Sequence, residues 1–199
     1  MRTISTILGC ALLAVSLSAC RTKEDKTDVP RLLAELQGGD PQASGQARLK
    51  LLKLGEPAVP ALAEMLRSGT PAERVTAANT LWGMGRRARA AVPDLAATLA
   101  DPDAELRVAA AMALENMGDA AAPAVPALTK AITDRDKKVR QAAVKALGAI
   151  GPLATAALPV LTRALRRQSW PEAEEAVRRI RGLEPGAPID LGPAEPENP

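Results

Sequence analysis

The sequence predicts an all-α fold, a solenoid of about five helix pairs that repeats every 33 residues. Three series of residues recur at this spacing. They are the prolines Pro60, Pro93, Pro126 and Pro159, the aliphatic residues Leu66, Leu99, Ile132 and Leu165, and a second aliphatic set, Leu81, Leu114, Leu147 and Ile180. Self-similarity at a fixed period of this length is typical of stacked repeats, in which each unit buries its apolar side against the next.

The composition is that of a folded domain with little catalytic chemistry. Of 199 residues, 25% are charged and 47% are hydrophobic, which is typical of globular proteins. The chain has no His, Tyr or Phe, and both cysteines, Cys10 and Cys20, lie in its first twenty residues. The body therefore lacks the usual general base and any thiolate ligand. We expect no enzymatic activity, no cofactor and no metal, and the net charge of +3 does not indicate a polyanionic partner.

The first expected element is a signal peptide over 1–19. Arg2 gives a positive start, Ile7 to Val15 is an apolar run with small residues, and Leu17-Ser-Ala-Cys20 closes the segment. The run is too short for a membrane span of about 20 residues. The last four residues resemble the lipobox of bacterial lipoproteins at every position. An ordinary cleaved leader with a chance cysteine is the alternative.

The lipoprotein resemblance implies a lipid anchor. In that family the cysteine sulfur receives a diacylglycerol and the leader is cut before it, so Cys20 would begin the mature chain and 20–27 would be the lipidated cysteine and linker. The new amino terminus is often acylated too, and more than one acyl chain gives stable anchoring. Arg21 in place of an aspartate implies the outer membrane, on its periplasmic face, with the inner membrane or the cell surface as alternatives.

Residues 28–182 form the expected repeat domain. Each unit is predicted to have a short helix beginning near a proline and a longer helix ending at a glycine. We expect capping boxes at Thr70-Pro-Ala-Glu73 and Ser169-Trp-Pro-Glu172, and capping acids at Asp40 and Asp101. Small residues needed for close helix packing recur at Ala77, Ala110, Ala143 and Ala176.

The segment from Asp134 to Gly151 resembles a short HEAT repeat of the kind found in phycobilin lyases. The signatures of ankyrin and tetratricopeptide repeats, which have similar periods, are absent. The resemblance implies a right-handed stack. It also implies a ladder in which an Asp and the Arg six residues later join neighbouring repeats, and which would comprise Arg74, Asp101, Arg107, Asp134 and Arg140.

In such stacks the second helix of each pair lines the concave face. The helical period leaves Val75, Trp82, Val108 and Met112 facing outward there. We interpret this apolar group as a binding site for a protein or peptide, because Trp and Met are frequent at binding surfaces. The alternatives are that the tail or linker covers the group, or that superhelical twist buries it.

The last expected element, 183–199, is a disordered tail. It contains five prolines, four acids and no basic residue, a composition that does not form a core.

Together these features predict a membrane-anchored, non-catalytic interaction scaffold of the bacterial cell envelope. An accessory or assembly role in an envelope or secretion complex fits it. One alternative is a lyase or chaperone-type enzyme, because some relatives handle bilin attachment. Another is a nucleic-acid binder that uses the basic positions Lys145, Arg178 and Arg181; export and the shortage of aromatics argue against it, so we expect no nucleic acid among the partners.

Overall fold

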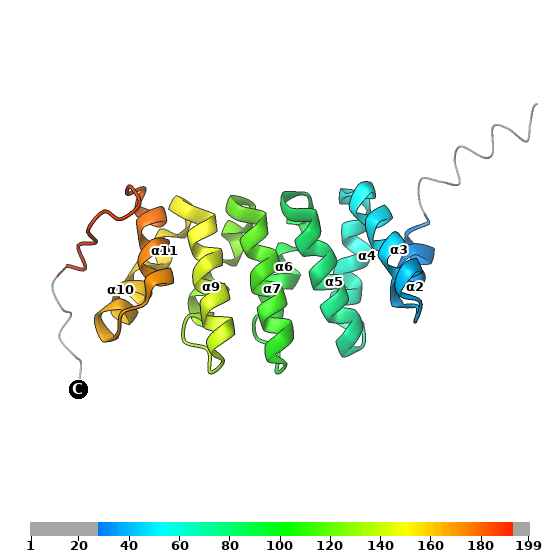
Figure 1. Cartoon of the computed structure of the whole chain (residues 1–199), viewed down its shortest axis with the longest axis horizontal. Coiled ribbons are helices and arrows are strands. Elements are labelled where there is room, and N and C mark those ends of the chain that lie inside the picture. The colour runs from blue at the N-terminus through cyan, green and yellow to red at the C-terminus, as the bar shows by residue number, and fades with distance from the viewer. Residues whose placement is uncertain (1–27, 193–199) are drawn as a thin grey trace, which may run out of the picture.

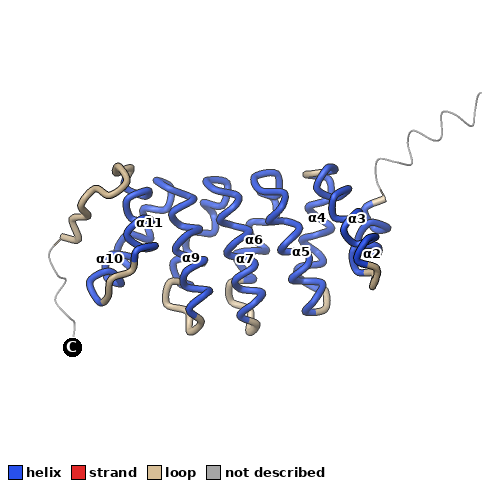
Figure 2. The backbone as a smooth tube through the Cα atoms, viewed as in Figure 1, coloured by secondary structure: helices blue, strands red, loops and turns tan. Residues whose placement is uncertain are grey.

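The computed structural model describes residues 28–192, and within this range every regular element is a helix. The helices form one row of repeats, shown in Figure 1 and traced by secondary structure in Figure 2. The predicted all-α solenoid is therefore confirmed. The signal peptide, Cys20, the linker 21–27 and the last seven residues, 193–199, lie outside the described residues.

Five helix pairs occupy the described range, as the period predicted. The pairs are α2 (Val29–Gln37) with α3 (Pro41–Leu54), α4 (Val59–Ser68) with α5 (Pro71–Met84), α6 (Val92–Thr98) with α7 (Ala104–Met117), α8 (Val125–Ala131) with α9 (Lys137–Ile150), and α10 (Leu158–Arg167) with α11 (Pro171–Arg181). Short 3-10 helices connect each pair to the next: η2 (Glu56–Ala58), η3 (Gly85–Ala91), η4 (Gly118–Ala124) and η5 (Gly151–Ala157).

The core lies between two layers of helices. The second helices α5, α7, α9 and α11 stand side by side and pack directly on one another, while the first helices make a second layer with fewer mutual contacts. The periodic residues Leu81, Leu114 and Leu147 are fully buried between the layers. The periodic alanines Ala77, Ala110 and Ala143 are fully buried as well, because a larger side chain would push the layers apart.

The repeats join at glycines. Gly85, Gly118 and Gly151 each end a second helix with a positive φ of 54°, 60° and 68°. This conformation costs glycine little and other residues more. The chain can therefore leave the second helix sharply and begin the 3-10 turn of the next repeat.

Two helix starts follow the sequence and two differ from it. The capping box of α5 forms: the amide of Glu73 donates to Thr70 Oγ1, and the amide of Thr70 donates to Glu73 Oε2 at 2.7 Å. Asp40 caps α3. The N-cap of α7, however, is Asp103 and not Asp101, because the Asp101 carboxylate instead accepts hydrogen bonds from Arg74 and from the amide of Asp103.

The expected box at Ser169 is absent. The N-cap of α11 is Trp170, which makes no capping hydrogen bond. Trp170 is only 9% exposed, and burial of its indole places it, rather than Ser169, at the start of the helix. Ser169 then stands one position too early to cap.

The first ten residues of the expected disordered tail have a defined path. Residues 183–192 run along α10 and α11 without regular structure. Arg178 Nε donates to the carbonyl of Ala187 at 2.9 Å, Arg181 donates to that of Asp190 at 2.6 Å, and Ile189 packs against the core. Composition did not reveal this, because the donors belong to the repeat domain.

One helical stretch of the described chain, Lys137–Arg167, is long and apolar enough to span a membrane by composition. It comprises α9, η5 and α10, turns at Gly151, and is half buried within the fold. The stretch is therefore part of the solenoid core.

Candidate functional site

The second helices α3, α5, α7, α9 and α11 form one face of the stack, which we call the second-helix face. Three of the large hydrophobic side chains that are exposed in the described chain lie on these helices: Leu49, Trp82 and Met112. We call them the apolar patch. Trp82 and Met112 are each 43% exposed and stand on neighbouring helices.

The four residues expected to bind a partner divide into two pairs. Trp82 and Met112 are exposed, whereas Val75 and Val108 are partly buried and pack against the core. Superhelical twist therefore does not cover Trp82 and Met112. The described tail residues contact α10 and α11 of the last pair, whereas Trp82 lies on α5 of the second pair.

Sequence reasoning missed Leu49. The turn η2 has three residues and η3 has seven, so the glycines that end α3 and α5 are 30 residues apart, at Gly55 and Gly85. Asn79 on α5 occupies the position that Met112 occupies on α7. The equivalent position on α3 is therefore Leu49, whereas a shift of 33 residues leads to Gln46. The shorter first turn, visible in the sequence, was the signal that could have found it.

Next to the patch, α7, α9 and α11 border a pocket of about 400 Å³ with charged walls. Its lining includes Glu115, Lys145, Glu172, Glu175 and Arg179. Gly148 also lines it and is buried, although the helical period of α9 by itself places Gly148 on the outward side with Lys145. A Cβ at Gly148 would lie 3.2 Å from the Cα of Ala176, so this glycine allows α9 and α11 to pack closely.

Two of the three basic positions considered for nucleic acid are engaged within the chain. Arg178 and Arg181 hold carbonyls of 183–192, and Arg178 also pairs with Glu174 at 3.4 Å. Lys145 faces the mixed-charge pocket. Two of the three cations of the basic stripe therefore already use donors within the chain.

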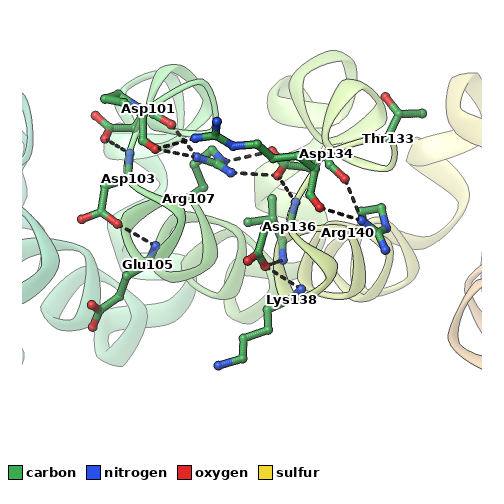
Figure 3. Close-up of polar contacts among 12 residues, drawn as sticks. Asp101, Asp103, Glu105, Arg107, Thr133, Asp134, Asp136, Lys138 and Arg140 are labelled. Atoms are coloured by element: carbon green, nitrogen blue, oxygen red, sulfur yellow. Dashed lines mark hydrogen bonds and ion pairs between the residues drawn. The ribbon is translucent and has the colours of Figure 1, made fainter.

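Ion pairs join the repeats on the side of the short loops, as Figure 3 shows for Arg107 and Asp134. Arg107 is 4% exposed, and its Nε and Nη2 donate to the two carboxylate oxygens of Asp134 at 2.9 and 2.8 Å. Its Nη1 donates to the carbonyls of Asp101 and Pro102. One repeat earlier, Arg74 donates to Asp101 at 2.6 Å. Each arginine thus ties its repeat to the carboxylate of the next one.

The buried pair stays ionised at neutral pH. Burial alone would raise the pKa of Asp134, but hydrogen bonds from Arg107 and from the amide of Asp136 outweigh it and lower the pKa below its usual value. The hydrogen bond to Asp134 raises the pKa of Arg107. Both groups therefore carry a charge at neutral pH. Their contacts, which join two repeats, indicate a structural function.

Arg140 completes no such pair in the described chain. Its Nη1 donates to the carbonyls of Asp134 and Arg135, within its own repeat. The residue 33 positions after Asp134 is Arg167, a cation in place of the carboxylate. Two of the three expected steps of the ladder therefore form.

The described residues contain no group of three or more His, Cys, Asp or Glu side chains that could hold a metal ion.

Comparison with known proteins identifies the repeat type. A family model for HEAT repeats matches residues 59–124 and 92–181. No curated protein matches the sequence.

Several solved structures share the fold. One is the complex of CpcE and CpcF of phycocyanin lyase from Nostoc sp. PCC7120, with a TM-score of 0.59 and 24% identity over 77% of this chain and 97% of that chain. An engineered protein matches with a TM-score of 0.55 and 25% identity over 82% of each chain. A designed armadillo repeat protein in complex with the peptide (KR)4 matches with a TM-score of 0.55 and 19% identity, over 76% of this chain and 80% of that chain.

Proposed function

Because the chain belongs to the HEAT repeat family, we propose that it is a non-catalytic scaffold that binds a protein or peptide on its second-helix face. We further propose that lipid on Cys20 anchors it to a bacterial membrane, at the periplasmic face of the outer membrane. The observation that carries the binding proposal is the exposure of Trp82 and Met112 on neighbouring second helices of that face.

An exposed apolar patch is costly for a soluble domain unless a partner covers it. Tryptophan contributes strongly at the centre of binding surfaces, and methionine adapts to partners of different shape. The charged pocket beside the patch supplies polar groups such as Lys145 and Glu115, which suit the rim of an interface. The arrangement fits a partner that lays an apolar segment across α3, α5 and α7.

The partner class is supported by fold as well as by surface. Repeat stacks present extended surfaces suited to proteins and peptides. One of the similar structures, a designed armadillo repeat protein, holds a peptide. We therefore place a protein or peptide before other ligands, and an accessory role in an envelope or secretion complex follows from the proposed anchor.

The anchor and the absence of catalysis are proposals from the sequence. Leu17-Ser-Ala-Cys20 matches the lipobox, and the chain has no histidine and no cysteine after Cys20. A HEAT-like stack with these side chains has surfaces for binding but few groups for acid–base or nucleophilic chemistry.

The proposed binding is tested by crosslinking and pull-down from membranes that contain the lipidated protein. Trp82→Glu with Met112→Glu should abolish capture of the partner, because two buried charges would replace the apolar contact. Helix content and melting temperature should stay close to those of the wild type, since both side chains are exposed.

Leu153→Glu is the matched control. Leu153 is also a large exposed hydrophobic residue, but it lies on the turn η5 and not on a second helix. Capture should survive this change. Unimpaired capture by the folded double variant would contradict the proposal, and unfolding of that variant would show that Trp82 and Met112 belong to the core.

A further inference from the structure

The ladder that joins the repeats lacks its last acceptor. Asp101 accepts from Arg74 and Asp134 accepts from Arg107. In the next repeat Arg140 occupies the position of the donor, but Arg167 and not an acid occupies the position of the acceptor. Where two earlier repeats pair a cation with a carboxylate, the last repeat brings two cations together.

A pocket of about 390 Å³ lies at this place, between the last two repeats. Arg140, Arg163 and Arg167 line it together with Trp170, and no acidic residue of the described chain does. The hydrogen bonds that the structure gives Arg140 all come from Nη1. Its Nε and Nη2, the atoms with which Arg107 grips Asp134, have no partner among the described residues.

The chain itself returns to this end of the stack. After α11, residues 183–192 run back along α10 and α11. Arg166, the neighbour of Arg167 on α10, donates to the carbonyls of Leu191 and Gly192. The described path therefore ends beside the part of α10 that borders the pocket.

We propose that the segment that follows Gly192 docks in this pocket and that Glu195 or Glu197 supplies the missing carboxylate to Arg140 and Arg167. An extended chain spans about 10 Å in three residues and about 17 Å in five, which are the reaches of Glu195 and Glu197 from Gly192, and Gly192 lies at Arg166, next to Arg167 of the pocket. Residues 193–199 carry two acids and no basic residue, which complements the charges of Arg140 and Arg167.

The docked carboxylate closes the last repeat as Asp134 closes the one before it. A solenoid needs its terminal repeat protected, because that unit has no following neighbour to bury its exposed side. Here the segment after the last helix takes the place of that neighbour. Binding in the pocket is independent of the proposed partner site on the second-helix face.

Iodide quenching of Trp170 fluorescence tests this docking. All samples are the full chain with Trp82→Leu, which leaves Trp170 as the single tryptophan. Iodide is an anion that the positive charges of Arg140 and Arg167 attract, so Glu195→Gln with Glu197→Gln should raise the iodide Stern–Volmer constant at least about twofold. Adding Arg140→Gln and Arg167→Gln to that variant should lower the constant again.

Glu184→Gln is the control, because it removes one charge from the same segment outside the proposed contact, and it should leave quenching unchanged. The Stern–Volmer constant for the neutral quencher acrylamide should differ much less than that for iodide between the chain with Glu195 and Glu197 and the variant with both changed to Gln. An iodide Stern–Volmer constant that is the same with and without the Glu195 and Glu197 changes would overturn the proposal. The pocket would then be open to external anions in the intact chain. Equal rises with iodide and acrylamide would also overturn it, because they would indicate general loosening.

Discussion

Arg107 is the only charged side chain of the described chain that is buried, and it serves two repeats at once. Arg107→Ala should lower the free energy of unfolding by roughly 3 kcal/mol, because it leaves the half-buried Asp134 without its cation. Urea denaturation followed by circular dichroism measures this. Arg86→Ala is the matched control: it removes an exposed ion pair between repeats, that with Asp119, and should cost much less. Equal losses in the two variants would show that burial of the Arg107 pair adds nothing.

Asp134 gives the same pair a pH dependence. Its pKa is lower in the folded protein than in the unfolded chain, where it is about 3.9. Ionisation therefore stabilises the fold: the contribution is complete above the unfolded pKa and is lost as the pH falls through the folded pKa. The stability difference between wild type and Asp134→Asn should be constant from about pH 5 to 7 and shrink below about pH 4. A difference that stays constant down to about pH 2 would contradict this.

Two helix starts with the same sequence pattern behave differently, and the difference can be measured. Thr70→Ala removes the capping box of α5 and should cost about 1 kcal/mol. Ser169→Ala changes the corresponding residue before α11, where no capping bond forms, and should change stability by less than about 0.5 kcal/mol. Thermal or urea unfolding of both variants makes the comparison. A larger loss for Ser169 would mean that its hydroxyl caps α11 in solution.

Each helix also depends on its neighbours in ways that its own sequence does not show. Gly148 has an outward position on α9, but α11 packs against it. Leu49 is exposed on α3 at a position that the 33-residue period misses, because the shorter turn η2 changes the register by three residues. Exposure on a second helix thus depends on the helices beside it and on the turns that set their positions.

For the molecule as a whole, the proposed anchor determines where the stack can work. In bacteria that express the full chain, the wild type should be found in the membrane fraction with a mass increase from the lipid. Cys20→Ser removes the sulfur that would carry the lipid and should yield a soluble or unprocessed protein. Cell fractionation and mass spectrometry of the intact protein measure both. Cys10→Ser, within the leader, should leave membrane retention intact, and normal retention of Cys20→Ser would rule out the anchor.

Most of the fold could be predicted from the sequence, because it depends on local chemistry that repeats. Prolines such as Pro93 begin the first helices, glycines such as Gly118 end the second helices, and aliphatic residues at the helical period lie between the layers. Each unit carries its own start, stop and buried stripe. The number of pairs and their order follow from these signals without knowledge of the tertiary structure.

Tertiary structure decided which side chains remain available for binding. Arg178 and Arg181 sit at outward positions, yet residues 183–192 occupy their donors. Arg140 resembles Arg107 in sequence but differs in partner, because Arg167 stands where the next acid would be. The physical reason is that a helical pattern specifies which side of a helix faces the core, whereas exposure and pairing depend on groups that distant parts of the chain bring alongside.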